Sequence, residues 1–333
     1  MAGYQPGAKR QKVREPRPGE NVDFFQGIDK VEYNNMAPMT DASSYRYYSA
    51  CERVHGRPME DWLRFSVSLT EFRSFGHDIK PAPWDDGTNT LDNSKRRIKA
   101  LFDFCQRLGV RYWTALDSDL VPPSESWEEG KIHWDEVIEY IQELTQRFKL
   151  KLMWIAPDLH SHARYNSGAL TSNEATIFVH AATQIKRCLE ASQRLNAECF
   201  LLWPHKEGYE TIFQTDVSRE IKLFAKLLKL TAEYKDRLNY RCQLLIMPYQ
   251  SKPRAQNEDL LNRYMWDVTS CLYLLKNYNL ERYYKVCCAP GHQLFMANVY
   301  NMLGGVVITN DVNQYDNKQL ALMMKSIIDQ VCS

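Results

Sequence analysis

Short apolar runs alternate with longer amphipathic stretches along most of the chain. Seven of the apolar runs predict buried strands, at Leu63–Leu69, Val110–Leu116, Lys151–Ala156, Cys199–Trp203, Cys242–Met247, Lys285–Cys288 and Val306–Thr309. Stretches with helical spacing follow them, at Ser94–Leu108, Asp135–Phe148, Asn173–Leu195, Asp216–Tyr234, Glu258–Lys276, Gly291–Leu303 and Lys318–Val331. Strands that alternate with helices are typical of parallel sheets, because parallel strands need long crossover connections.

The number of units favours a TIM-type (β/α) barrel over residues 63–333, with a doubly wound open sheet as the alternative. Seven units are visible, and the eighth strand is expected near Ser333, where the sequence ends. We therefore expect a barrel truncated to seven units, without the eighth. Another segment of the chain or a partner would fill the gap between its two edge strands. Asn93 or Ser94 is expected to cap the first helix, and Asp216 or Ser218 the fourth.

Composition indicates a globular protein rather than a disordered or a wholly nucleic-acid-binding one. Of the 333 residues 44% are hydrophobic and 25% are charged, and the net charge is +1. No apolar run approaches the roughly 18–20 residues of a membrane helix, and residues 1–21 lack the apolar segment of a secretory signal. Nine cysteines without a C-x-x-C pair predict reduced thiols, and hence an intracellular, cytoplasmic protein.

The first 21 residues are rich in glycine, proline and charge. Their basic residues are Lys9, Arg10, Lys12, Arg14 and Arg17. Such a segment is typical of a solvated extension, and the alternative is a basic arm that binds an acidic partner. Residues 22–62 then form a lead-in to the barrel.

Four segments carry a resemblance to a known family. They are RPMEDWLRFSV (57–67), RYNSGALTSNEATIFVHAATQIKRCLEASQRLNAECFLLW (164–203), WPHKEGYETIFQTD (203–216) and LLIMPYQ (244–250). In this order and spacing they resemble the class II xylose (glucose) isomerases, over most of residues 24–325. The resemblance implies a barrel that isomerises sugars with a ring-opening histidine, a lysine and two divalent metals held by carboxylates and histidine.

The positions at which that family carries its chemistry are changed here. By the resemblance, Leu116 stands for the histidine, while its carboxylate partner is retained as Asp119. Met247 and Cys288 stand for two metal-binding glutamates, Tyr249 for the lysine and Ile308 for a ligand aspartate. Magnesium and manganese require oxygen ligands, so we expect no isomerase site, no metal and no other cofactor.

Polar side chains nevertheless follow the first four predicted strands. His77 and Asp78 follow the first strand, and Asp117 and Asp119 follow the second. Asp158, His160 and His162 follow the third strand, and His205 and Lys206 follow the fourth. In a barrel all of them would lie on the carboxyl-terminal face, where sites are built. The pair His160 and His162 with a nearby carboxylate is a candidate for a relocated zinc site, although a histidine-x-histidine pair on a loop is common.

These observations favour a non-catalytic pseudoenzyme that serves as a structural, protein-binding component of a larger assembly. The first partner to consider is an acidic filament, such as the microtubule lattice of the cytoskeleton or a cilium, bound through the basic arm. Nucleic acid ranks behind it, and no membrane is expected. The family's tetramer is not expected, because its C-terminal arm has no counterpart. The alternative is a sugar-binding protein, or an enzyme with a rebuilt, metal-dependent site around Asp119, His160 and His162.

Overall fold

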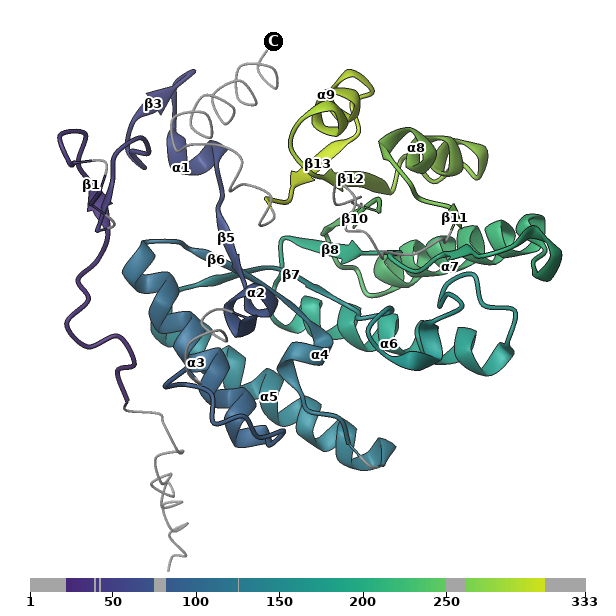
Figure 1. Ribbon diagram of the computed structural model, residues 1–333, viewed down its shortest axis with the longest axis horizontal. Coiled ribbons are helices and arrows are strands. Elements are labelled where there is room, and N and C mark those ends of the chain that lie inside the picture. Colours follow the sequence, from purple (N-terminus) through teal and green to yellow (C-terminus); the bar gives the residue numbers. More distant parts are fainter. Residues whose placement is uncertain are drawn as a thin grey trace, which may run out of the picture.

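The computed structural model of the protein describes residues 22–38, 40–41, 43–74, 82–124, 126–249 and 262–308 (Figure 1). Within these ranges, seven parallel strands follow one another around a curved sheet. They are β5 (Ser66–Ser68), β6 (Tyr112–Leu116), β7 (Lys151–Ala156), β8 (Cys199–Leu202), β10 (Gln243–Ile246), β12 (Tyr284–Cys288) and β13 (Leu303–Val306). The predicted α/β fold is therefore confirmed.

The strand order decides between the two predicted architectures. Strands β5, β6 and β7 are hydrogen-bonded in that order, as are β8, β10, β12 and β13, and every one of these pairings is parallel. The Glu198 N–H donates to the Leu152 carbonyl at 3.2 Å and joins the two groups between β7 and β8. Because each strand lies beside the next one in the chain, with no reversal of order, the sheet is that of a TIM-type barrel.

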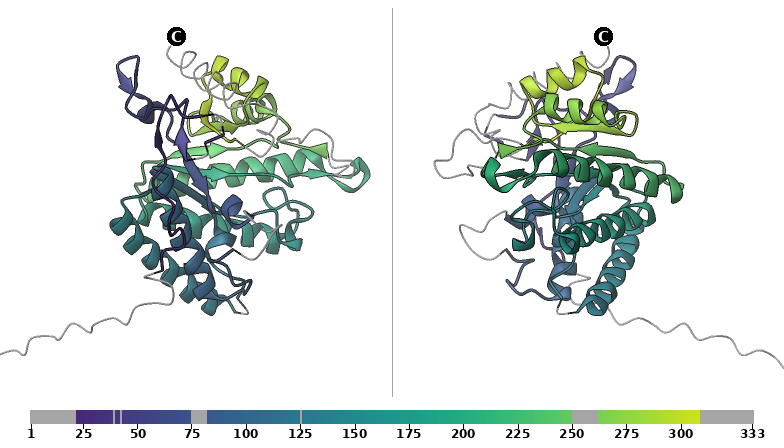
Figure 2. Two further views of the ribbon diagram at one scale, coloured as in Figure 1. Left: turned by 60° about the vertical axis from the view of Figure 1, so that its left-hand side comes forward. Right: turned by 90° about the vertical axis from the view of Figure 1, so that its right-hand side faces the viewer.

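Helices cover the outer side of this sheet (Figures 1 and 2). The longer ones are α3 (Leu91–Leu108), α5 (Trp127–Phe148), α6 (Ala175–Arg194), α7 (Val217–Arg237), α8 (Val268–Asn277) and α9 (His292–Val299). Asp216 caps α7 as predicted, since its side chain accepts a hydrogen bond from the Arg219 N–H. The cap of α3 is instead Thr90, which lies one turn ahead of the predicted Asn93 or Ser94.

Several predicted boundaries are wrong. Helix α8 begins at Val268 rather than Glu258, because Asp267 caps it and the residues before it include the short strand β11 (Asn262–Arg263). Helix α5 begins at Trp127 rather than Asp135, because Ser126 caps an additional polar stretch. Helix α9 ends at Val299 and strand β13 starts at Leu303, three residues before the predicted Val306. Asn301 has a φ of 55°, which ends the helical backbone early enough for the strand to begin there. The predicted helix Lys318–Val331 lies outside the described residues.

The lead-in segment packs beside α3. It contains the short strand pairs β1 (Glu32–Tyr33) with β2 (Ser44–Tyr45), and β3 (Arg53–Val54) with β4 (Arg57–Pro58), followed by α1 (Met59–Trp62). The Tyr45 hydroxyl donates to the Leu108 carbonyl at 2.9 Å, and the ring of Phe25 lies 5.1 Å from that of Trp84. These contacts fix the segment against the barrel.

Residues of β6, β7, β8, β10 and β12 are divided between two separate apolar clusters. On β10, Leu244 and Ile246 pack outward against the helices, while Leu245 faces the lumen with the following Met247. The lumen holds a cavity of about 690 Å³ that reaches both edge strands, at Ser66 and Ser68 of β5 and at Leu303–Val306 of β13. The lumen is therefore apolar without being completely filled.

Candidate functional site

The positions that carry the chemistry in the resembling family lie where the strands end. Leu116, Met247 and Ile308 all line the lumen cavity near the carboxyl ends of their strands. Cys288 is different, because it packs outward in the helix-facing core, and its neighbour Cys287 faces the lumen. None of these side chains offers the oxygen ligands that magnesium or manganese requires. The two metals of the family therefore do not fit these positions.

A group of aromatic side chains extends from the cavity across this face. We call His160, Trp203, His205, Tyr249 and Trp266 the aromatic cluster. Successive ring centroids are 4.7 Å apart from His160 to Trp203 and 4.9 Å from Trp203 to His205. They are 5.2 Å apart from His205 to Tyr249 and 5.4 Å from Tyr249 to Trp266, which is half exposed.

Trp203 joins this cluster to the lumen, because it also lines the cavity. Its indole N–H is buried and finds no hydrogen-bond acceptor within the described ranges. A buried donor of this kind is costly unless a ligand or water completes it. Apolar ring faces next to an unused donor suit a ligand with both C–H and hydroxyl surfaces, such as a sugar.

His160 lies close to a carboxylate on its own loop. Its Nδ1 lies 3.3 Å from the Oδ1 of Asp158, and both side chains are mostly buried. Asp158 also accepts hydrogen bonds from the Ser161 N–H at 2.9 Å and from the Ser118 hydroxyl at 2.7 Å. The carboxylate thus has a fixed orientation, and Nδ1 of His160 lies beside it without a hydrogen bond to any residue that the structure describes.

The pKa values of this pair move in ways that suit proton transfer. Burial lowers the pKa of His160 below its ordinary value, and Asp158 opposes this shift only in part. Burial alone would raise the pKa of Asp158, but the nearby His160 and the Ser161 and Ser118 hydrogen bonds outweigh it, so that this pKa lies below the ordinary value. At neutral pH the pair is a neutral imidazole beside a carboxylate, which is the state of a general base.

A second, deeper carboxylate supports the loop. Asp117 is fully buried and accepts hydrogen bonds from the Asp158 N–H at 2.8 Å and from the Gln184 amide at 2.9 Å. Burial raises the pKa of Asp117, while the Arg187 guanidinium at 3.2 Å acts in the opposite direction. Arg187 in turn lies 4.5 Å over the ring of Trp134. This network fixes the backbone at Asp158, two residues before the histidine.

Glu207 fastens the far end of the same loop. It is buried after β8 and accepts the N–H groups of Ala169, Leu170 and Thr171, each at 3.0 Å, together with the Thr171 hydroxyl at 2.6 Å. The loop that carries His160 is thereby bound to the loop that carries His205 and Lys206. Glu207 is a positioning residue for the site, although it does not face the cavity.

The predicted combination of Asp119, His160 and His162 does not form a site in this structure. Asp119 accepts from the Thr70 hydroxyl at 2.5 Å and pairs with Arg73 at 2.8 Å. His162 is exposed, and its Nδ1 accepts from the backbone and side chain of Arg164. A guanidinium beside that nitrogen repels a cation. Across the described part of the chain, no group of three or more His, Cys, Asp or Glu side chains is arranged to hold a metal ion.

Other predicted residues cannot be placed. His77 and Asp78, and the arm residues Lys9, Arg10, Lys12, Arg14 and Arg17, lie outside the described residues. Among those described, sequence reasoning selected His160 but missed its pairing with Asp158, and it missed the aromatic cluster altogether. The sequence did contain a signal for this cluster. A histidine or tyrosine follows each of three consecutive strands, at His160, His205 and Tyr249.

Comparisons with known proteins agree with this fold. No protein-family profile matches the chain. The chain is similar to xylose isomerase from Hordeum vulgare, with 32% identity over 92% of the chain and 68% of the relative. It is also similar to xylose isomerases from Arabidopsis thaliana, with 33% identity over 85% of the chain and 61% of the relative, and from Thermotoga maritima, with 32% identity over 89% and 68%.

Solved structures with the same fold have much lower identity. A D-allulose 3-epimerase from Methylomonas sp. aligns with a TM-score of 0.55 and 10% identity over 81% of each chain. A 3-keto-D-glucoside 4-epimerase from E. coli aligns with a TM-score of 0.53 and 10% identity, over 80% of this chain and 88% of the other. At this identity the likeness establishes the barrel fold alone.

These findings correct the functional predictions. The prediction of a non-catalytic structural component, cytoskeletal or ciliary, is wrong, and so is the prediction that the chain is not an enzyme. The relatives that share about a third of its residues are sugar isomerases, and nothing in the comparisons points to a filament. No helix within the described ranges is long and apolar enough to cross a membrane. The partners expected for the basic arm stay a prediction.

Proposed function

This chain belongs to the xylose isomerase family, and on that premise we propose that it is a sugar-modifying enzyme of the isomerase and epimerase class. Its reaction is proton transfer next to the carbonyl carbon of a sugar. The observation that carries the proposal is His160 of the aromatic cluster, which lies next to the Asp158 carboxylate on the carboxyl-terminal face. That face is where barrel enzymes build their sites.

The sugar would lie against Trp203, at the boundary between the lumen cavity and the aromatic cluster. The ring face of Trp203, which lines the cavity, suits the C–H face of a sugar. The cavity volume of about 690 Å³ falls within the range of small-molecule sites. Substrate recognition therefore needs only groups that the structure already brings together.

The reaction follows from the state of His160. Its neutral imidazole removes the proton from the carbon next to the carbonyl, and the C–H electron pair forms the double bond of an enediolate. Lys206 follows β8, and its ammonium group donates to the Asn166 side-chain oxygen at 2.8 Å. Its charge helps to lower the pKa of His160, and it is the cation that would stabilise the enediolate oxygen. Return of the proton to the former carbonyl carbon, while the hydroxyl proton of the enediolate moves to the oxygen on that carbon, gives an isomer. Return of the proton to the opposite face of the original carbon gives an epimer.

The family's metals enter no step of this proposal, because Met247, Cys288 and Ile308 cannot replace their oxygen ligands. The two chemistries differ in an observable way. A metal-assisted hydride shift keeps the substrate hydrogen, whereas an enediolate exchanges it with solvent. We therefore expect activity that a chelator does not abolish, accompanied by uptake of solvent hydrogen.

The test is incubation of the protein with aldopentoses, ketopentoses, aldohexoses and ketohexoses in D₂O, followed by NMR. Deuterium should enter the carbon next to the carbonyl, with or without EDTA. His160→Gln should lower the rate by about 10²–10⁴-fold, while the matched control His162→Gln, on the same loop, should retain it. Turnover that EDTA abolishes, turnover without deuterium uptake, or no turnover of any sugar would contradict the proposal.

A further inference from the structure

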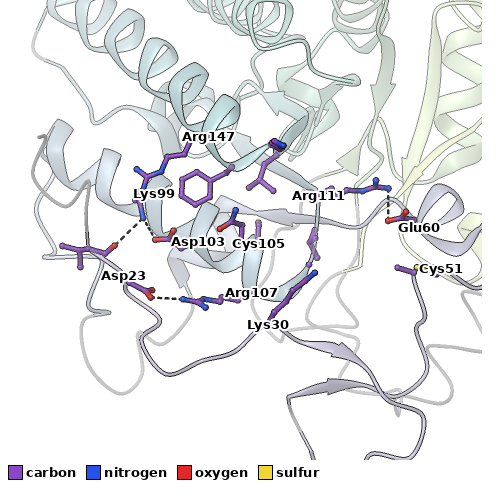
Figure 3. Close-up of a pocket in the computed structure, with 18 residues that line it drawn as sticks. Asp23, Lys30, Cys51, Glu60, Lys99, Asp103, Cys105, Arg107, Arg111 and Arg147 are labelled. Carbon is purple, nitrogen blue, oxygen red and sulfur yellow. Dashed lines mark hydrogen bonds and ion pairs between the residues drawn. The ribbon is translucent and has the colours of Figure 1, made fainter. Parts of the chain in front are cut away.

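A second cavity lies at the opposite end of β6 and β7 from the aromatic cluster (Figure 3). Its volume is about 1030 Å³, and its walls come from the lead-in segment and from the ends of α3 and α5. Val110 and Leu150, which precede β6 and β7, lie in its lining, so the cavity is on the amino-terminal face of the barrel. We propose that this cavity binds a phosphate-bearing small molecule.

The charge of the lining is the first argument. Its basic side chains are Lys30, Lys99, Arg107, Arg111, Arg147 and Lys149. Its acidic side chains are Asp23, Glu60 and Asp103. Six basic groups against three acidic ones leave an excess of three positive charges. The whole chain has a net charge of only +1, so this excess is concentrated at the cavity.

Ion pairs already use each of the acidic groups. Lys99 binds Asp103, and Arg107 pairs with Asp23 at 2.8 Å. Arg111 pairs with Glu60 at 3.1 Å, and these three pairs appear in Figure 3. The remaining cations, Lys30, Arg147 and Lys149, form no ion pair with any residue that the structure describes between 22 and 308.

Two helix termini reduce this positive excess but do not remove it. Helix α3 ends at the C-cap Gly109 and α5 at the C-cap Lys149, and both caps line the cavity. Each helix C-terminus carries about half a negative charge. Together they offset about one of the three positive charges and leave about two. A phosphate monoester near neutral pH has the complementary charge of about −1.5 to −2.

The cavity has more room than a phosphate group needs. Its floor is apolar, formed by the buried side chains of Phe148, Leu150 and Cys105. Two of the cations, Lys99 and Arg147, lie 5.3 and 5.4 Å from the centroid of the Phe148 ring. A ligand whose phosphate contacts cations of the lining would lay its remaining atoms over this floor. The same chemistry is offered by free phosphate and by an organic phosphate ester.

The test is calorimetric titration of the full chain with adenosine 5′-monophosphate and with inorganic phosphate. Saturable binding of one ligand per chain is expected at an ionic strength of about 0.01 M, with weaker binding at about 1 M. The double variant Lys30→Gln/Arg147→Gln should weaken it by about tenfold or more. Tighter binding of the nucleotide would identify an organic ester as the source, and equal binding would identify free phosphate.

The matched control is Lys222→Gln/Lys226→Gln, which removes the same charge from two exposed lysines on α7 that form no ion pair with described residues. Circular dichroism checks that both variants fold, and Lys30→Gln alone replaces the double variant if it does not. Three outcomes overturn the proposal. The first is no saturable binding of either phosphate compound, and the second is an equal loss of affinity in both double variants. The third is binding of an oligothymidylate that depends on Lys30 and Arg147 and that adenosine 5′-monophosphate does not displace.

Discussion

Replacing Glu207 by alanine should strongly destabilise the protein and loosen the loop that carries His160. The carboxylate is 1% exposed and accepts four hydrogen bonds from residues 169–171. Alanine would leave three backbone N–H groups and one hydroxyl without their acceptor. Each buried donor left unsatisfied costs about 1–3 kcal/mol.

The four contributions do not add fully, because a loop freed from Glu207 can turn some donors toward water. We therefore expect Glu207→Ala to lower the free energy of unfolding by about 3–5 kcal/mol. Glu207→Gln keeps one acceptor oxygen but points an amide N–H₂ at the remaining donors, so it should cost about half as much, roughly 2 kcal/mol.

The measurement is urea unfolding followed by circular dichroism and tryptophan fluorescence. The matched control is Glu210→Ala, three residues along the same loop, where the side chain is exposed and the change should stay within about 0.5 kcal/mol. If Glu207→Ala unfolds at the same urea concentration as Glu210→Ala, the four hydrogen bonds do not stabilise the loop and the reasoning is refuted.

Three further predictions concern the backbone, pH and thiol reactivity. Gly168→Ala should lower the melting temperature far more than Gly56→Ala. Both glycines have positive φ, but of the two only Gly168 would place the new Cβ 2.3 Å from a neighbouring side chain. Equal losses of melting temperature would contradict this. The pKa of Asp158 is lower in the folded protein than in the unfolded chain. Its carboxylate therefore stabilises the folded state above about pH 4, and this stabilisation is lost as the pH falls through the folded pKa. Asp158→Asn should therefore flatten the acid limb of the stability curve, and an unchanged limb would show that the pKa is not shifted. In a Cys332→Ser background, a thiol reagent should modify Cys51 of the native protein quickly, and Cys51→Ser should remove that fast phase. The reason is that the other described cysteines are buried, and burial raises the pKa of Cys105 and Cys288 to about 12.

Periodicity was sufficient to predict the fold class, because strand and helix spacing are local properties of the chain. The runs around Cys199–Trp203 and Cys242–Met247 became β8 and β10, and Asp216 caps α7. Two of the boundaries that failed, at Trp127 and Leu303, depend on a cap and on a left-handed residue that hydrophobic spacing does not register.

The direction in which a strand residue points was harder to predict. Cys287 and Cys288 are neighbours of similar chemistry, and only the pairing of β12 decides that Cys287 faces the lumen. A shift of one residue exchanges the two faces of a strand. Resemblance along the chain could identify the strand end, but it could not determine which of the two thiols faces inward.

The sequence by itself determined the alternation of strands and helices, the polar residues after the strands, and the loss of the family's ring-opening histidine at Leu116 and of a metal-binding glutamate at Met247. Only the tertiary structure decided which polar residues act together. It separated Asp119, bound by Arg73, from His160, and joined His160 to Trp203 and to Asp158. The physical reason is that hydrogen bonds and ring contacts depend on distances between segments far apart in the chain, whereas periodicity records only neighbours along it.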